Sequence, residues 1–213
     1  MIKLQGKLPR NLVLACSGGV DSMAALDFLR RNHKVTVAHV NHRTEHGIKT
    51  AAWLREQCRT KFKDVRYREF VIEGTCPKGV SKEEWWRNER YNWLNSTFYG
   101  QTVVTVHHLD DCVETWVWSS MHGQGKIIPY RNEHVIRPFR LTRKRDLELW
   151  ANLNTVEYKE DDSNKDLCYT RNYIRHEMLP HVLRVNPGIH KVIAKKIKDN
   201  MGKDGHVKQE SNT

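Results

Sequence analysis

The feature that most limits the fold of this chain is an apolar run that ends in a glycine turn and continues as a helix. Residues 11–16 (NLVLAC) have the composition of a buried strand, residues 17–19 (SGG) permit a tight turn, and apolar side chains then recur at helical spacing over residues 23–29. A strand that passes straight into a helix is the first half of a β-α-β unit. The pattern therefore predicts a parallel sheet.

The same alternation continues to about residue 121. Further strands are expected at residues 35–40, 65–72 and 102–106, and helices at residues 50–61, 82–98 and 110–121. Strands that alternate with helices in this way predict an α/β fold, a doubly wound parallel sheet that is covered on both faces.

The character of the chain changes around Pro138. Beyond residue 143 no strand pattern is evident, and helical patterns follow at residues 145–153, 171–183 and 189–197. We therefore predict three parts, which are an α/β domain over residues 1–140, a helical appendage over residues 141–200 and a disordered tail over residues 201–213.

Composition narrows the partners and the compartment. The 213 residues include 36 Lys and Arg against 25 Asp and Glu, a formal charge of +11 that favours an anionic partner such as nucleic acid. The five cysteines form no C-x-x-C pair, which argues against a disulfide framework and a zinc ribbon. There is neither a signal peptide nor a run of about 18–20 apolar residues that would span a membrane. We expect a soluble cytoplasmic protein without a membrane partner.

The turn after the first strand is a candidate phosphate-binding loop. Residues 17–22 (SGGVDS) match neither G-x-x-x-x-G-K-[ST] nor G-x-G-x-x-G, but their backbone N–H groups lie at the N-terminus of a helix, where an anion binds. Because the loop has no lysine, the charge of a triphosphate would need Mg²⁺, and Asp21 is the carboxylate suited to holding it. The alternative is an ordinary glycine turn followed by a helix cap.

A second motif, residues 107–114 (HHLDDCVE), follows the strand at residues 102–106 and starts a helix, so we expect it at the same edge of the sheet. Asp111 and Glu114 are three residues apart and therefore project from one helical face. Two carboxylates can hold an ammonium group, and one of them could help to remove a proton from an amine before it attacks. The alternative is that Asp110 or Asp111 only caps the helix.

Several histidines follow strand ends, where they could instead hold a metal ion. That alternative, a metal-dependent hydrolase, would draw its ligands from His39, His42, His46, His107 and His108. It would leave the complete phosphate loop unexplained.

Basic side chains gather near these motifs. Arg87 and Arg90 are three residues apart on an aromatic-rich helix, where they could meet a phosphate or a base together, or snorkel from an aromatic core face. A dense basic segment covers residues 126–145, and Arg171 and Arg175 continue it. A solvated charged face is one explanation of such a segment, but beside an anion site it favours contact with an RNA backbone.

The motifs and their order resemble the PP-loop ATP pyrophosphatases and, among these, the tRNA(Ile)-lysidine synthetases. The resemblance covers about residues 10–190 and rests on SGGVDS at 17–22, HVNH at 39–42, WRNERY at 86–91, HHLDDCVET at 107–115, RPF at 137–139, DSN at 162–164, RNYIR at 171–175 and NP at 186–187. It implies an enzyme that uses ATP and Mg²⁺ to adenylate the C2 oxygen of the wobble cytidine in an isoleucine tRNA with a CAU anticodon. The ε-amine of L-lysine then attacks C2, and AMP leaves.

With this resemblance, roles follow for particular residues. We expect catalytic roles for Asp21, Arg87, His107, Asp111 and Glu114, with Asp21 holding the metal and the pair Asp111 and Glu114 recognising lysine. The expected nucleotide-binding residues are Ser17, Gly18, Gly19, Asp21, Ser22, His39 and Asn41. The expected tRNA-binding residues are Arg90, Arg137, Arg143, Lys144, Arg171 and Arg175.

The chain departs from the family pattern in two places. Trp86 stands where the family usually has alanine before the arginine, and many lysidine synthetases continue into further C-terminal domains that grip the tRNA. A minimal enzyme would rely on its own basic surface, which a homodimer could extend. The alternatives that stay open are another PP-loop tRNA-modifying enzyme, for thiolation or amide-nitrogen transfer, and a non-catalytic tRNA-binding relative.

Overall fold

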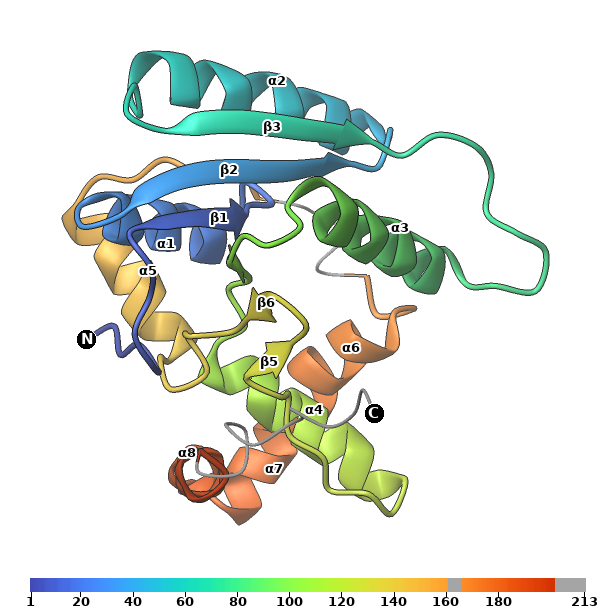
Figure 1. The fold of residues 1–213 in the computed structure, drawn as a ribbon. Helices are drawn as coiled ribbons and strands as arrows, with labels where there is room; N and C mark the ends of the chain where they lie inside the picture. The colour runs from blue at the N-terminus through green and yellow to red at the C-terminus, as the bar shows by residue number, and fades with distance from the viewer. Residues whose placement is uncertain (161–165, 202–213) are drawn as a thin grey trace, which may run out of the picture.

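One six-stranded sheet forms the centre of the molecule. The structure, a computed structural model, describes residues 1–160 and 166–201. The strand order is β3-β2-β1-β4-β6-β5 (Figure 1). All pairings are parallel except that between β5 and β6. The strands are β1 (Asn11–Ala15), β2 (Lys34–Asn41), β3 (Arg66–Val71), β4 (Val103–Val104), β5 (Arg131–Asn132) and β6 (Val135–Ile136). The predicted α/β class with a parallel sheet is confirmed.

Helices follow the strands in the order that the sequence predicts. They are α1 (Val20–Arg30), α2 (Glu45–Thr60), α3 (Lys82–Thr97), α4 (Leu109–Met121), α5 (Lys144–Leu153), α6 (Thr170–Tyr173), α7 (Leu179–Val185) and α8 (Ile189–Asp199), with a π-helical turn at Ile174–Met178 between α6 and α7. No helix in the described part of the chain is long and apolar enough to cross a membrane.

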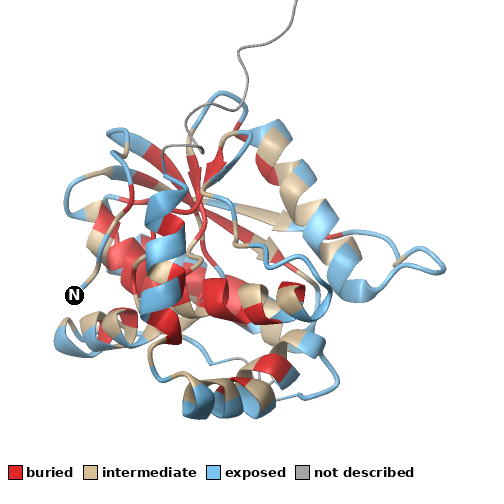
Figure 2. Cartoon of the chain, turned by 90° about the horizontal axis from the view of Figure 1, so that it is seen from below, coloured by how far each residue is buried: buried red, intermediate tan, exposed pale blue. Residues whose placement is uncertain are grey.

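Alternating side chains of the strands build a core on each face of the sheet. Leu12 and Leu14 of β1 pack in the cluster that contains α1, α2 and α5, whereas Val13 packs with Leu94 and Phe98 at α3. Figure 2 shows the buried residues gathered in the strands and on the inward faces of the helices. This two-sided burial is why β1 reads as a continuous apolar run.

A further apolar cluster lies away from the sheet. It joins α4 to the C-terminal helices and contains Leu109, Cys112, Val113, Val117, Ile174, Leu179, Ile189, Ile193 and Ile197. By contrast, Leu147 and Ala151 of α5 belong to the core of the sheet. The division predicted at residues 140 and 141 stays a prediction, and the tail predicted beyond residue 201 lies outside the described residues, as does the DSN motif at 162–164.

Three local details differ from the sequence prediction. Helix α2 begins at Glu45, five residues early, because the Thr44 hydroxyl caps it by accepting from Gly47 N at 3.0 Å. Strands β5 and β6 were not predicted, because two residues each are too few to show an alternating pattern. The helical pattern at residues 171–183 contains the π-helical turn, which the sequence does not signal.

Candidate active site

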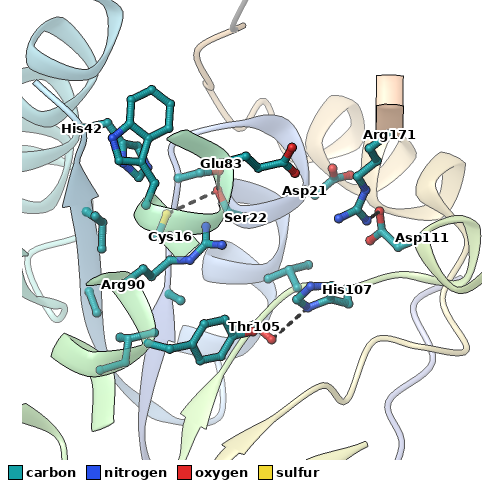
Figure 3. Close-up of a pocket in the computed structure, with 18 of the residues that line it drawn as sticks. Cys16, Asp21, Ser22, His42, Glu83, Arg90, Thr105, His107, Asp111 and Arg171 are labelled. Carbon is teal, nitrogen blue, oxygen red and sulfur yellow. Dashed lines mark hydrogen bonds and ion pairs between the residues drawn. The ribbon is translucent and has the colours of Figure 1, made fainter. Parts of the chain in front are cut away.

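A cavity of about 490 Å³ opens where the carboxyl ends of β1, β2 and β4 meet. Its walls come from the phosphate loop, the end of β2, helix α3, the end of β4 and the segment that contains α6 (Figure 3). This edge of a parallel sheet is where α/β proteins bind their ligands. The sequence prediction that the two main motifs meet here is therefore matched by the cavity.

The phosphate loop holds its shape through glycine and its own serines. Gly18 has φ +89°, and a Cβ there would lie 2.6 Å from Cγ2 of Thr50. The hydroxyl of Ser22 accepts from Gly18 N at 3.1 Å and donates to Gly19 O at 3.0 Å. Among the described residues no side chain caps α1, which begins directly after Gly19, so the first N–H groups of the helix are suited to binding an anion.

Asp21 offers a carboxylate oxygen to this loop. Its Oδ1 is buried without a hydrogen-bond partner in the described structure, and its Oδ2 lies 3.7 Å from Nε2 of His108. A buried, unpaired carboxylate oxygen beside a phosphate site fits Mg²⁺, which is usually held by one or two carboxylates together with substrate phosphates. Within residues 1–160 and 166–201, no three His, Cys, Asp or Glu side chains form a metal centre by themselves.

The expected lysine-binding carboxylates face two arginines. Oδ1 of Asp111 accepts from Nη2 of Arg171 at 2.7 Å, and Oε1 of Glu114 accepts from Nε of Arg175 at 2.7 Å. Arg171 also donates from Nε to Oε2 of Glu114 at 3.2 Å. Burial raises the pKa of Asp111, but His108 and Arg171 outweigh burial and hold that pKa below its usual range. Both carboxylates lie on α4, and both arginines lie on the segment that follows residue 170.

Two of the residues that we expected to bind tRNA lie inside the cavity. Arg171 and Arg175 turn toward the carboxylates and line the cavity, instead of forming an open basic surface. The sequence shows that the two carboxylates share a helical face, and likewise that the two arginines do. No local signal shows that the arginines, some sixty positions further along the chain, contact the carboxylates. Their roles toward tRNA stay predictions.

His108 has a function in the site that the sequence analysis did not assign. Its ring Nδ1 accepts from the backbone N–H of Asp111 at 3.2 Å, and the backbone N–H of His108 donates to Oδ2 of Asp111 at 2.9 Å. This reciprocal arrangement is a capping box, and the H-x-x-D spacing is the signal that could have revealed it. The cap fixes the first turn of α4 and places Nε2 of His108 toward Asp21. Asp110 is not the cap, because its Oδ2 accepts from Lys144 N at 2.8 Å.

His107 lines the cavity as a neutral side chain. Its Nδ1 lies 3.0 Å from Oγ1 of Thr105. Burial lowers the pKa of His107 to about 3; Asp111 opposes this shift, and Arg137 reinforces it. The ring is therefore uncharged at neutral pH.

We expect His107 to make stability depend on pH. The folded ring stays neutral down to about pH 3, whereas an unfolded histidine takes up a proton near pH 6.5, so the free energy of unfolding falls as the pH falls through this window. The contribution approaches about 1.4 kcal/mol per pH unit. Urea unfolding at pH 7.5, 6.5 and 5.5 should show a steeper loss for the wild type than for His107→Gln. Identical slopes would contradict the assignment.

The expected nucleotide contacts at the end of β2 point away from the cavity. Nδ1 of His39 donates to Cys16 O at 2.9 Å, and burial lowers the pKa of His39, which keeps the ring neutral. The amide of Asn41 donates to Oε1 of Glu69 at 3.1 Å. The cavity is lined by the alternate positions of this segment, including His42. The roles of His39 and Asn41 toward a nucleotide stay predictions.

The basic segment before α5 is largely occupied in holding the fold. Arg137 is buried and donates from Nη2 to the hydroxyl of Tyr91 at 3.2 Å. Nε of Arg143 lies 3.6 Å from Oδ1 of Asp110. Lys144 begins α5 and gives its backbone N–H to the same carboxylate. The charges of Arg137 and Arg143 are therefore less available to RNA than the sequence suggests, and Nζ of Lys144 lies 3.9 Å from Oε1 of Glu148.

Helix α3 brings one of its two expected arginines into the cavity. Arg90 lines the cavity, and its guanidinium lies over the ring of Tyr91 at 5.8 Å from the ring centroid. Burial lowers the pKa of Arg90, with Tyr91 opposing this effect. Arg87 is exposed and lies over the same ring at 5.3 Å.

The chain is similar to known proteins of one family. A family model described as a PP-loop domain matches residues 2–182. The tRNA(Ile)-lysidine synthase of Thermotoga maritima is 31% identical over 193 residues, which cover 84% of this chain and 47% of the relative. That of Staphylococcus epidermidis is 30% identical over 206 residues, which cover 89% and 48%. That of Lactiplantibacillus plantarum is 31% identical over 202 residues, which cover 87% and 45%.

The chain spans about half the length of the curated relatives that it matches. Among solved structures, an NH3-dependent NAD synthetase from Campylobacter jejuni aligns with 97% of this chain and 92% of its own, at a TM-score of 0.47 and 14% identity. Because the family model covers most of the sequence, including every part of the cavity, this chain belongs to the PP-loop domain family.

Proposed function

We propose that this chain joins L-lysine to the wobble cytidine of a CAU-anticodon isoleucine tRNA at the expense of ATP. One observation carries the proposal, which is that a single cavity contains both the phosphate loop with Asp21 and the carboxylate of Asp111. The first is suited to a nucleotide triphosphate and the second to an ammonium group. The relatives described above are tRNA(Ile)-lysidine synthases, which supports the same reaction. An enzyme that modifies tRNA in this way would work in the cytoplasm.

The reaction has two steps. The C2 oxygen of the cytidine attacks the α-phosphorus of ATP, and pyrophosphate leaves. The lysine ε-ammonium group then gives a proton to a carboxylate and becomes an amine. The amine attacks C2, loses a second proton to solvent, and AMP leaves with the oxygen. Mg²⁺, held by Asp21 and the phosphates, would neutralise the charge that develops on the pyrophosphate.

The residues of the chain would mainly position the reactants and compensate their charge. The N-terminus of α1 and the glycines of the loop orient the phosphates, while Asp111 and Glu114 hold the lysine ammonium group near C2. Because Arg171 and Arg175 already bind these carboxylates, the ammonium group has to share them with two guanidinium groups. The neutral ring of His107 has one N–H group and one unprotonated nitrogen, so it can donate one hydrogen bond and accept another, but it does not start with the acidic proton of an imidazolium.

The cysteines favour this reaction over thiolation. Burial raises the pKa of the Cys16 thiol beside the phosphate loop, with Ser22 opposing the shift, and burial raises the pKa of Cys112 to about 12. A thiolating enzyme needs a reactive thiolate, which neither side chain supplies at neutral pH.

The test is ATP-dependent incorporation of labelled lysine into a CAU-anticodon isoleucine tRNA transcript. A methionine tRNA and a transcript with the wobble cytidine replaced are run beside it. Incorporation that requires the cytidine supports the proposal, and Asp21→Ala should abolish it. Pyrophosphate release with a different nucleophile would move the function to a sister PP-loop reaction, and tRNA binding without ATP turnover would favour a non-catalytic relative.

Exposed lysines of α8 are the better candidates for contact with the RNA backbone. Lys191, Lys195 and Lys198 form an exposed stripe at helical spacing, and they have no ion pair with other described residues. Because each neutralised phosphate releases a counterion, replacing all three with glutamine should weaken tRNA binding at least about tenfold near 0.1 M salt. The slope of log affinity against log salt should fall by about 2–3. Filter binding over a salt series measures both.

A variant of equal charge serves as the control. Lys49, Lys61 and Lys63 lie on or just after α2, and replacing them with glutamine removes the same three charges from another part of the surface. Equal loss of tRNA binding in the two variants would show that only net charge matters and would remove the special role of α8. A homodimer stays a prediction.

A further inference from the structure

The end of the cavity beside α3 is lined by aromatic and small apolar side chains, whereas the other parts of the cavity are lined mainly by polar and charged ones. The rings of Trp86 and His42 lie against each other, with centroids 4.7 Å apart and an interplanar angle of 38°. Both side chains line the cavity, and Ala38 and Val40 of β2 line it beside them. This end therefore presents an aromatic wall next to small apolar side chains.

This aromatic end and the carboxylate end lie on different sides of the phosphate loop. In Figure 3, His42 lies to one side of Cys16 and Ser22, and Asp111 with Arg171 lies to the other. A ligand anchored on the loop by its phosphates can thus extend toward either end. The carboxylate end is suited to a positively charged group. The aromatic end is suited to a different part of the ligand, namely a flat ring.

Arg90 adds a positive charge to the aromatic end. Its side chain lines the cavity, and it makes no hydrogen bond or ion pair with another described residue beyond its contact with the Tyr91 ring. Glu83 also lines the cavity, and its charge opposes the lowering of the pKa of Arg90, but no hydrogen bond joins the two side chains. A guanidinium group whose N–H groups have no partner among the described residues, close to a candidate anion-binding loop, is suited to a phosphate oxygen. A flat aromatic surface beside such a group matches a nucleotide, whose base stacks while its phosphate is bound.

We propose that Trp86, whose ring contacts His42, is the stacking surface for a nucleobase in this cavity, and that Arg90 holds a phosphate of the same nucleotide. The proposal rests on the proposed function in that the ligand is a nucleotide. It goes further by assigning a role to the tryptophan that the sequence analysis found in place of alanine. The base belongs either to ATP or to the RNA, and the test separates these sources.

The test measures binding of three probes to Trp86→Ala and to the wild type. The probes are a non-hydrolysable ATP analogue, a CAU anticodon stem-loop RNA, and inorganic tripolyphosphate, which has phosphates but no base. Loss of stacking should weaken one of the two base-containing probes about 5- to 150-fold, because stacking on an aromatic side chain contributes about 1–3 kcal/mol per base. Tripolyphosphate should bind unchanged.

Two further variants separate stacking from a structural role. Trp86→Phe keeps an aromatic ring and should retain most of the affinity. Trp85→Ala removes the neighbouring tryptophan of α3, which does not line the cavity, and should have no effect on binding of the probes.

The probe that Trp86→Ala affects identifies the base. Weaker binding of the ATP analogue would identify the base as adenine, and weaker binding of the RNA alone would identify it as a base of the anticodon loop.

Other outcomes overturn the proposal. If Trp86→Ala binds both base-containing probes as the wild type does, Trp86 is not a stacking surface, while the proposed function stands. If tripolyphosphate binding falls equally, the change has disturbed the cavity as a whole, and stacking is not the cause. A wild-type protein that binds neither the ATP analogue nor the RNA would overturn the proposed function and, with it, this assignment.

Discussion

Replacing Gly18 with alanine is expected to lower ATP-dependent turnover at least about a hundredfold. The new Cβ would lie 2.6 Å from Cγ2 of Thr50 at a backbone φ of +89°, so the loop has to move. A displacement of about 1 Å in a group that positions a reactant can cost about a hundredfold in rate. Pyrophosphate release at saturating ATP measures the effect.

Two variants show which part of this loss comes from the collision. Gly74 has φ +88° with open space around it, so Gly74→Ala carries the same backbone strain without a collision and should leave turnover near wild type. Adding Thr50→Ser to Gly18→Ala removes the methyl group that collides, while the serine hydroxyl can keep the contact with His46. Partial recovery in this double variant is expected. A Gly18→Ala protein with full turnover would contradict the role of the loop.

Replacing Glu114 with alanine is expected to reduce both stability and lysine transfer. Glu114 is only 3% exposed, and its carboxylate accepts hydrogen bonds from Arg171 and Arg175. Its removal leaves partly buried guanidinium groups without their partner, which should lower the free energy of unfolding by about 2–3 kcal/mol. Lysine incorporation should fall at least about a hundredfold, because the ammonium group loses one of its two carboxylates. Urea unfolding and labelled-lysine incorporation measure the two effects separately.

Replacing Glu114 together with Arg175 distinguishes a structural role of Glu114 from a role in lysine transfer. Replacing a buried ion pair with apolar side chains of similar size is often neutral for stability, so Glu114→Met combined with Arg175→Met should regain most of the lost stability. It should not regain lysine transfer. A double variant that transfers lysine as the wild type does would show that Glu114 only holds the segment after residue 170 in place.

The sequence predicted the central sheet well because its signals are local. Strands β1 and β2 are apolar runs bounded by turn residues, and the glycine turn after β1 marks the edge at which ligands bind. The phosphate loop and the HHLDD motif could therefore be placed together before any side-chain contact was known. The meeting of Asp111 and Glu114 with Arg171 and Arg175 could not, because it depends on how the segment that follows α5 packs against α4.

The end of β2 shows a second limit of predicting ligand contacts from the sequence. The alternation of a strand predicts that His39 and Asn41 share one face and that Val40 and His42 share the other. Which face borders the cavity depends on how α3 packs, and no pattern within β2 contains that information. Position at a strand end is thus a weaker indication of ligand contact than position in the loop itself.

The carboxylate of Asp110 has a consequence for exchanging parts between relatives. Its Oδ1 lies 2.9 Å from Nε2 of His190 in α8, and its Oδ2 accepts from Lys144 N at the start of α5. One side chain in the first turn of α4 thus joins α5 and α8 to that helix. A chimera that takes α8 from another protein would keep this connection only if the replacement helix also presents a hydrogen-bond donor at the position of His190.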